Sequence, residues 1–264
     1  TDALSKTFNI GGEINYTESF NDYNKVKFVF ESTFSNSTSD RFVYQYNEAT
    51  NDYSIQDITL SNEFENRNIS QKLGATYKYE KDKFELSLGG NYQYTQLNSD
   101  RTYPNNIEVY KKYHNLLPSA QLEYKFSKGN NINLFYRTST KSPSVSQLQD
   151  VIDNTNPLNF SSGNKDLNQQ YSHFLGFRWR YSKPAKGNSA FIFIGGGLNN
   201  NYITNSTILV SKDTLLSNDI LLPAGGQYTR PVNLNGNWNL RTFVNYGTPL
   251  LFMKSNMNIN ARLN

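Results

Sequence analysis

A regular alternation of apolar and polar residues runs through most of the chain. Between Phe84 and Tyr94, every second residue is phenylalanine, leucine, glycine or tyrosine, and Glu85, Ser87 and Asn91 lie between them. Successive side chains of a β-strand point to opposite faces, so this period of two predicts a strand with one apolar and one polar face. Ten such strands are predicted, at residues 8–16, 26–34, 69–79, 84–94, 116–126, 132–136, 175–181, 190–198, 232–246 and 257–263.

The connections between the predicted strands alternate between short and long. Short turns are predicted at residues 21–24, 80–83, 127–131, 182–188 and 247–254. Long polar loops are predicted at residues 36–62, 96–112, 199–224 and in the segment that follows Arg137. Outer-membrane β-barrels have short periplasmic turns and long extracellular loops. The pattern therefore predicts an all-β fold, an antiparallel up-and-down transmembrane β-barrel.

The charged residues within the strands agree with a membrane location. An arginine or lysine that faces lipid at the bilayer midplane costs about 2–4 kcal/mol. Glu31, Glu85, Arg178 and Arg241 all lie in the polar half of their alternating patterns. We therefore expect them to face the barrel interior. Residues 190–198 are apolar at both sets of positions, so the pattern gives no inward or outward assignment for that strand.

The number and order of strands bear on the domain organisation. With short turns in the periplasm, the first strand runs toward the periplasm and the tenth runs outward, which places both ends of the chain on the extracellular side. Complete barrels of this class start and finish at the periplasmic end. Residues 1–264 are therefore interpreted as a single segment of a larger barrel of about 22 strands. A plug domain and the remaining strands would lie outside this sequence.

Composition narrows the possible partners. The chain has 264 residues with a mean hydropathy of −0.68, and 14% of them are aromatic, which fits strands with one lipid-facing side. Its net charge of +4 comes from scattered residues and there is no basic run, so we expect no nucleic-acid partner. The longest apolar run, Ala190 to Ile194, is far shorter than the roughly 20 residues of a membrane-spanning helix. Outer-membrane lipid is the expected surrounding.

Residues that often carry chemistry are few. Cysteine is absent, and His114 and His173 are the only histidines, without a metal-binding spacing. No G-x-S-x-G run indicates a hydrolase. Asp150, Asp153 and Asp166 do not match a calcium loop, so we expect solvated carboxylates that cap turns. The sequence therefore predicts no enzyme, no cofactor and no metal site.

Two runs in the C-terminal half resemble TonB-dependent outer-membrane receptors, in particular the group typical of Bacteroidota. The first comprises R-x-x-x-x-S-P-x-x-x-Q-L from position 137, DNTNPL from 153, GNKDL from 163 and YS from 171. The second is GGQYTRPVNLNG from position 225. Lys165 stands in place of the usual proline, and Gln169 and Gln170 stand where Pro-Glu is common. These departures bear on the subfamily and the cargo rather than on the fold.

The resemblance implies uptake of a small nutrient ligand with energy supplied by TonB through a plug domain. In that interpretation no residue is catalytic, and seven residues form the lumen wall or bind the ligand: Arg137, Arg178, Arg180, Asn233, Asn235, Asn239 and Arg241. The expected location is the outer membrane. Two alternatives stay open from the sequence, a structural, adhesive or secretion-linked barrel without transport and a soluble carbohydrate-binding β-sandwich. The cargo is not identified by the sequence.

Overall fold

Ten long strands form one antiparallel sheet in the computed structural model, which describes residues 2–58, 61–148, 150, 152–154, 156–217 and 220–263. Each long strand pairs with the next long strand along the chain, so the sheet is an up-and-down meander, as the sequence predicted. The strands are β1 (Asp2–Ser19), β2 (Asn24–Phe42), β5 (Asn62–Lys81), β6 (Phe84–Tyr103), β7 (Ile107–Ser127), β8 (Asn130–Lys141), β10 (Gln170–Lys183), β11 (Asn188–Asn200), β16 (Asn237–Leu250) and β17 (Ser255–Leu263).

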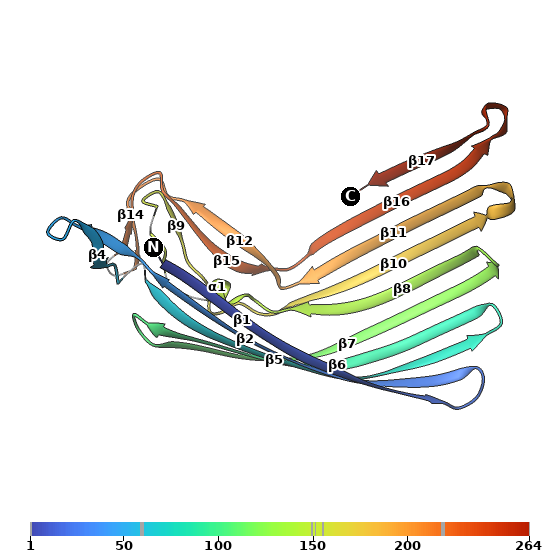
Figure 1. Ribbon diagram of the computed structural model, residues 1–264, viewed down its shortest axis with the longest axis horizontal. Helices are drawn as coiled ribbons and strands as arrows, with labels where there is room; N and C mark the ends of the chain where they lie inside the picture. Colours follow the sequence, from blue (N-terminus) through green and yellow to red (C-terminus); the bar gives the residue numbers. More distant parts are fainter. Residues whose placement is uncertain are drawn as a thin grey trace.

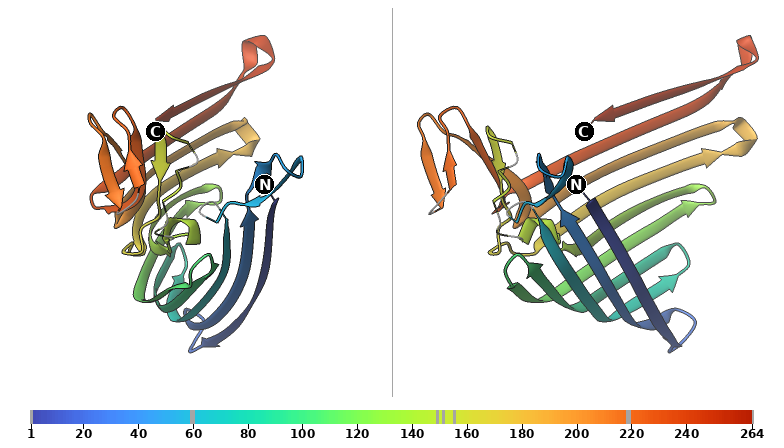
Figure 2. Two further views of the ribbon diagram at one scale, coloured as in Figure 1. Left: turned by 90° about the vertical axis from the view of Figure 1, so that its left-hand side faces the viewer. Right: turned by 60° about the vertical axis from the view of Figure 1, so that its left-hand side comes forward.

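The sheet curves into a trough (Figures 1 and 2). Strands β1 and β17 form its two edges and, within the described residues, do not pair with each other. One end of the trough carries only tight turns, including the short 3₁₀ helices η1 (Pro184–Lys186) and η2 (Leu251–Met253). A soluble β-sandwich needs two large sheets packed face to face, so the single curved sheet excludes that alternative.

The other short elements lie at the opposite end of the trough (Figure 1). We call them the cap. It consists of the hairpins β3 (Tyr44–Asn47)–β4 (Asp52–Gln56) and β13 (Thr214–Ser217)–β14 (Ile220–Leu222), helix α1 (Val145–Leu148), and a three-stranded sheet of β12 (Tyr202–Leu209), β15 (Gln227–Leu234) and β9 (Asn159–Ser161). The segregation of turns and cap agrees with the predicted periplasmic and extracellular ends.

The predicted long loop at residues 96–112 is wrong. Strand β6 continues to Tyr103 and β7 begins at Ile107, so only three residues connect them. The outward residues of β6 are apolar or aromatic up to Tyr94 and polar from Gln96 onward. Beyond the lipid both faces of a strand meet polar surroundings, so the alternation disappears although the strand continues. The predicted loop at 36–62 is likewise partly strand, because β2 runs to Phe42.

The predicted single strand at residues 232–246 is also wrong. Gly236 adopts a left-handed conformation, with φ of 81°, that breaks the extended backbone. Strand β15 on one side of it pairs with β12 and β9 in the cap, and β16 on the other side pairs with β11 and β17 in the trough. The apolar alternation passes through Gly236 without a break, so periodicity alone did not reveal the change of sheet.

Strand pairing assigns the two faces of the sheet. One continuous outward row across seven adjacent strands is Val26, Tyr77, Leu88, Ala120, Tyr136, Leu175 and Gly196. The same register places Phe191 and Phe193 of β11 inward and Ile192 and Ile194 outward. That strand is therefore apolar on both faces because its inner side carries aromatic rings.

Several charged residues of the strands lie on the inner face and pair there. Lys72 Nζ of β5 lies 3.1 Å from a Glu31 carboxylate oxygen of β2. Glu85 of β6 lies within 3.0 Å of Lys78 and 3.6 Å of Lys125. These placements confirm the inward orientation that we expected for Glu31 and Glu85.

Candidate functional site

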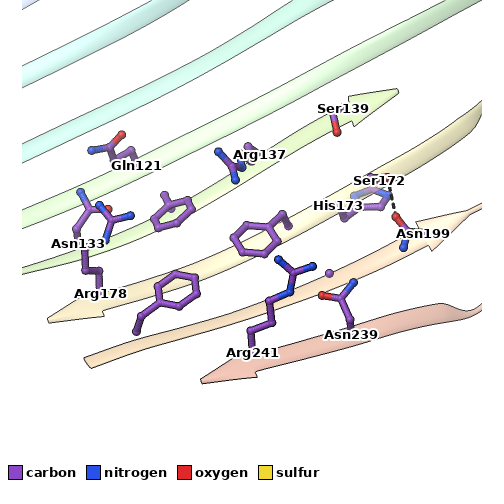
Figure 3. Close-up of a pocket in the computed structure, with 14 residues that line it drawn as sticks. Gln121, Asn133, Arg137, Ser139, Ser172, His173, Arg178, Asn199, Asn239 and Arg241 are labelled. Carbon is purple, nitrogen blue, oxygen red and sulfur yellow. Dashed lines mark hydrogen bonds between the residues drawn. The ribbon is translucent and has the colours of Figure 1, made fainter. Parts of the chain in front are cut away.

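An open hollow of about 740 Å³ lies on the inner wall of the trough. It spans β7, β8, β10, β11 and β16, and Figure 3 shows the side chains that line it. Arg137, Arg178 and Arg241 bring three positive charges to the hollow from three different strands. Among its described residues, no histidine hydrogen-bonds to a carboxylate or a serine. We call this surface the arginine hollow.

Strand register places most of the lining residues in three consecutive inward rows, and Ser139, Ser172 and Asn199 form a further row beside the cap. Of the three rows, the one nearest the cap is Ser119, Arg137, Phe174, Gly197 and Asn239. The middle row is Gln121, Phe135, Gly176, Gly195 and Arg241. The row nearest the turns is Glu123, Asn133, Arg178, Phe193 and Phe243. Each arginine therefore has phenylalanines in its own row or the next one.

Glycines in the middle row make space for the aromatic rings. A Cβ atom at Gly176 would lie 2.4 Å from Cζ of Phe135. One at Gly195 would lie 2.6 Å from Cζ of Phe193 and 2.7 Å from Cζ of Phe174. These separations are too short for any side chain larger than hydrogen. The three rings therefore lie close against the sheet, over positions without a side chain.

The guanidinium groups of two arginines lie over these rings. Arg137 Cζ is 5.1 Å from the ring centre of Phe174 and 5.7 Å from that of Phe135. Arg178 Cζ is 5.5 Å from the ring centre of Phe135. A cation–π contact at an exposed site contributes about 0.5–1 kcal/mol and holds the guanidinium in place. The rings therefore hold Arg137 and Arg178 in position while leaving their N–H groups free to bind a ligand.

The positive charge of the hollow is not neutralised by the wall itself. Within the described part of the chain, none of Arg137, Arg178 and Arg241 has a carboxylate oxygen within 4.0 Å. Arginine binds carboxylates and other oxyanions through paired N–H groups, and it also stacks on aromatic faces. The hollow therefore has the chemistry to hold an anionic group, a planar group, or both.

Polar amides form the side of the hollow nearest the cap. Ser172 Oγ donates to Asn199 Oδ1 at 2.6 Å, and Asn199 Nδ2 donates to Asn237 Oδ1 at 2.7 Å. Gln170 Nε2 also donates to Asn199 Oδ1 at 3.2 Å. This chain of hydrogen bonds fixes the amides across β10, β11 and β16. It gives the hollow a polar margin toward the extracellular end.

The structure brings together four of the seven residues that the sequence singled out. Arg137, Arg178, Asn239 and Arg241 line the arginine hollow. Arg180 points inward on β10, one row nearer the turns, opposite Phe191 and Asn131.

Asn233 and Asn235 lie elsewhere, in and next to β15 of the cap. Asn233 Oδ1 accepts from the Asn168 N–H at 2.7 Å, and its Nδ2 donates to Asn201 O at 2.8 Å. Asn235 Oδ1 accepts from the Asn201 N–H at 2.8 Å. Both amides therefore hold cap segments together in this structure.

The two histidines lie on the outer face, where apolar residues give way to polar ones. His114 Nδ1 is 2.6 Å from the hydroxyl of Tyr92, and His173 Nδ1 is 2.8 Å from that of Tyr136. Each pair joins neighbouring strands. No three side chains of the metal-ligating types gather in the described part of the chain, and none of its helices is long and apolar enough to cross a membrane.

Comparison with known proteins gives the family. A sequence profile described as the outer membrane protein beta-barrel family matches residues 2–264. No curated protein sequence shows a significant match.

Solved structures with a similar fold are outer-membrane receptors and a transporter. The Serratia marcescens hemophore receptor HasR has a TM-score of 0.62 at 14% identity, over 99% of this chain and 42% of that one. The copper transporter OprC has a TM-score of 0.58 at 10% identity, over 93% of this chain and 35% of that one. The Pseudomonas aeruginosa ferric enterobactin receptor PfeA has a TM-score of 0.52 at 12% identity, over 98% of this chain and 44% of that one.

The chain spans less than half the length of each of these proteins, and at such identities the likeness establishes the fold alone. The fold nevertheless agrees with the sequence profile, with the meandering sheet, and with the separation of turns from cap. The chain therefore belongs to the outer membrane protein beta-barrel family.

Proposed function

We propose that this chain forms one side of a receptor barrel that takes up a small nutrient through the outer membrane. Energy would come from TonB through a plug domain elsewhere in the protein. The arginine hollow is the observation that carries the proposal. A barrel with a purely structural role has no need for three unneutralised arginines on its inner wall, whereas a path for an anionic ligand or a plug surface does.

The proteins with a similar fold support the same proposal of nutrient uptake. HasR is a hemophore receptor, PfeA a ferric enterobactin receptor and OprC a copper transporter. These names belong to those proteins, and the cargo of this chain stays open. In our proposal Arg137, Arg178 and Arg241 contact either the cargo or the plug, and Arg180 extends the positive surface toward the periplasm. Asn233 and Asn235 contribute by holding the cap in place around the entrance.

The proposal is tested by nutrient depletion. Cells that lack the protein, cells that lack TonB and complemented cells are grown in one complex medium, and the compounds remaining are measured by mass spectrometry. We expect at least one compound to be depleted only when the protein and TonB are both present. The double variant Arg178→Gln/Arg241→Gln should deplete that compound at least several-fold more slowly.

The control is Arg67→Gln. Arg67 is an exposed arginine on the outer face of β5, ion-paired with Glu65 at 2.9 Å, and its replacement should leave uptake unchanged. Identical depletion profiles with and without the protein would favour the structural, adhesive or secretion-linked barrel instead. Uptake that persists without TonB would contradict the energised mechanism.

A further inference from the structure

A second, smaller cavity lies on the inner face of the sheet, near the cap. Its volume is about 160 Å³, and it is bounded by β5, β6, β7 and the segment that contains α1. Phe64, Ile107, Val109 and Leu148 supply apolar walls, and Arg101 reaches in from β6. It shares no lining residue with the arginine hollow.

The roof of this cavity is firmly held. Leu148 of α1 is completely buried and packs in one cluster with Leu97 of β6 and Leu167. The Asn164 N–H donates to Gln147 O at 2.6 Å, which ties α1 to the returning segment. Packed and hydrogen-bonded residues therefore hold the α1 side of the cavity in place.

Arg101 is buried without a partner for its charge. Only 8% of its surface is exposed, and its Nε donates to Asn105 O at 3.1 Å. In the described part of the chain, its two Nη nitrogens donate no hydrogen bond and no carboxylate oxygen lies within 4.0 Å of them. Burial lowers the pKa of Arg101, with no opposing effect from a nearby acid. An unpaired buried charge costs several kcal/mol, so an anion in the cavity would stabilise the fold.

We propose that this cavity binds a small monocarboxylate with a compact apolar body, such as an aromatic acid or a short-chain fatty acid. The two free Nη groups match the two oxygens of a carboxylate, which arginine binds through parallel hydrogen bonds. The apolar walls suit a hydrocarbon body. An apolar cavity of about 150 Å³ holds a benzene molecule, so the volume here fits a ligand of that size.

The surrounding charges select a single negative charge. Lys165 is a second cation at the cavity and Asp150 is an acid, whereas the Glu108 side chain lies on the outer face of β7, in register with Asp100. Lys165 and Asp150 are exposed, and only Arg101 is buried. A dianion such as phosphate would meet the Asp150 carboxylate without gaining a second buried cation. A monocarboxylate needs only Arg101.

Calorimetric titration of the purified full-length protein in detergent tests the proposal. The probes are sodium benzoate and sodium hexanoate, with neutral benzamide and inorganic phosphate as comparisons. We expect saturable binding of one benzoate or hexanoate per chain, and at least ten-fold weaker binding of benzamide and phosphate. Absence of saturable benzoate and hexanoate binding would overturn the proposal, and would indicate that Arg101 meets another part of the protein instead. Equal affinity for phosphate would overturn the monocarboxylate assignment.

Three variants locate the binding. Arg101→Gln removes the charge and Val109→Phe fills the apolar end, and each should weaken benzoate binding at least ten-fold. Arg67→Gln, at the exposed outer arginine, should leave it unchanged. Unaltered binding in Arg101→Gln would refute the site. If Arg101→Gln fails to assemble, the Val109→Phe variant and the comparison of benzoate with benzamide still show whether the cavity binds a carboxylate. Uptake need not be measured, so failure here leaves the proposed transport function untouched.

Discussion

Glycines at inward positions of β10 and β11 determine the shape of the arginine hollow. Gly176 and Gly195 lie beneath phenylalanine rings and Gly197 lies against the Asn239 amide, whereas Gly196, between Gly195 and Gly197 in the sequence, faces outward. A Cβ atom at Gly196 would have no neighbour nearer than 3.8 Å. Three glycines in a row therefore have different roles according to the face on which they lie. Gly176 and Gly195, on the inner face, allow phenylalanine rings to lie flat against the wall, and the arginines lie over those rings.

This difference gives a residue-scale prediction. Gly176→Ala should push the Phe135 ring off the sheet and lower the free energy of unfolding by about 1–3 kcal/mol, as overpacking does. The measurement is urea unfolding of the protein reconstituted in lipid vesicles. Gly196→Ala is the matched control and should change stability by much less. Equal effects of the two substitutions would contradict the close packing of Phe135 on Gly176.

The arginines of the hollow were predictable from the sequence, but the phenylalanines were not. Arg178 and Arg241 occupy polar positions of an alternating pattern, so their inward orientation followed from periodicity. Phe135, Phe174 and Phe193 also face inward, against the rule that apolar residues face lipid. Glycine opposite or next to each of them was the available signal, because it marks a place where a ring can lie against the backbone. Asn233 looked like a wall residue only because the break at Gly236 was not recognised.

At the scale of elements, the five strands from β1 to β7 in the trough are about twice as long as a membrane requires. A transmembrane strand needs about 9–11 residues, whereas β5 and β6 have 20 residues each and β7 has 21. On β6 the outward apolar band ends at Tyr94, and the remaining residues to Tyr103 continue as paired strand. The sheet therefore extends well past the lipid as a continuous hydrogen-bonded wall.

Single-cysteine labelling tests this boundary, because the chain has no cysteine of its own. Thr102→Cys lies outward and exposed on the extended part of β6, and Leu88→Cys lies in the middle of the apolar band. A membrane-impermeant maleimide applied to intact cells should label Thr102→Cys readily and Leu88→Cys hardly at all. Labelling of both variants to the same extent would place the lipid boundary elsewhere.

The sequence predicted which segments form strands, but it did not predict how long those strands are. All ten strands of the trough appear where the sequence predicted strands, and all but β11 show apolar and polar alternation, since lipid on one face imposes that pattern. Residues 96–112 carry no such pattern because neither face meets lipid, so the sequence there resembles a loop. The cap could not be predicted for the same reason. Its order depends on specific contacts, such as the burial of Leu97, Leu148 and Leu167 together, which periodicity does not reveal.

At the scale of the whole molecule, the trough has two free edges. Strand β1 pairs only with β2 and β17 only with β16 within the described residues. Unpaired backbone groups in hydrocarbon cost several kcal/mol each, so an open sheet of this kind is not stable in a bilayer. We therefore propose that further strands pair with both edges, consistent with a chain that spans less than half of its structural neighbours.

Expression of residues 1–264 alone tests this proposal. The segment should fail to give the compact, heat-modifiable band that folded outer-membrane barrels show on electrophoresis, because its edges stay unsatisfied. The full-length protein is the control and should give that band. A folded, membrane-inserted form of the segment alone would mean that its ten strands can close on themselves.

The extended wall also affects what can approach the cell surface. The nine residues of β6 beyond Tyr94, at roughly 3.3 Å per residue and a tilt of about 40°, raise the rim about 23 Å above the lipid. A paired sheet of that height is stiff, unlike a set of mobile loops. Antibodies or phages that recognise this protein would therefore contact a rigid, largely polar β-sheet. Their binding would depend on shape complementarity to that sheet and not on the capture of flexible peptides.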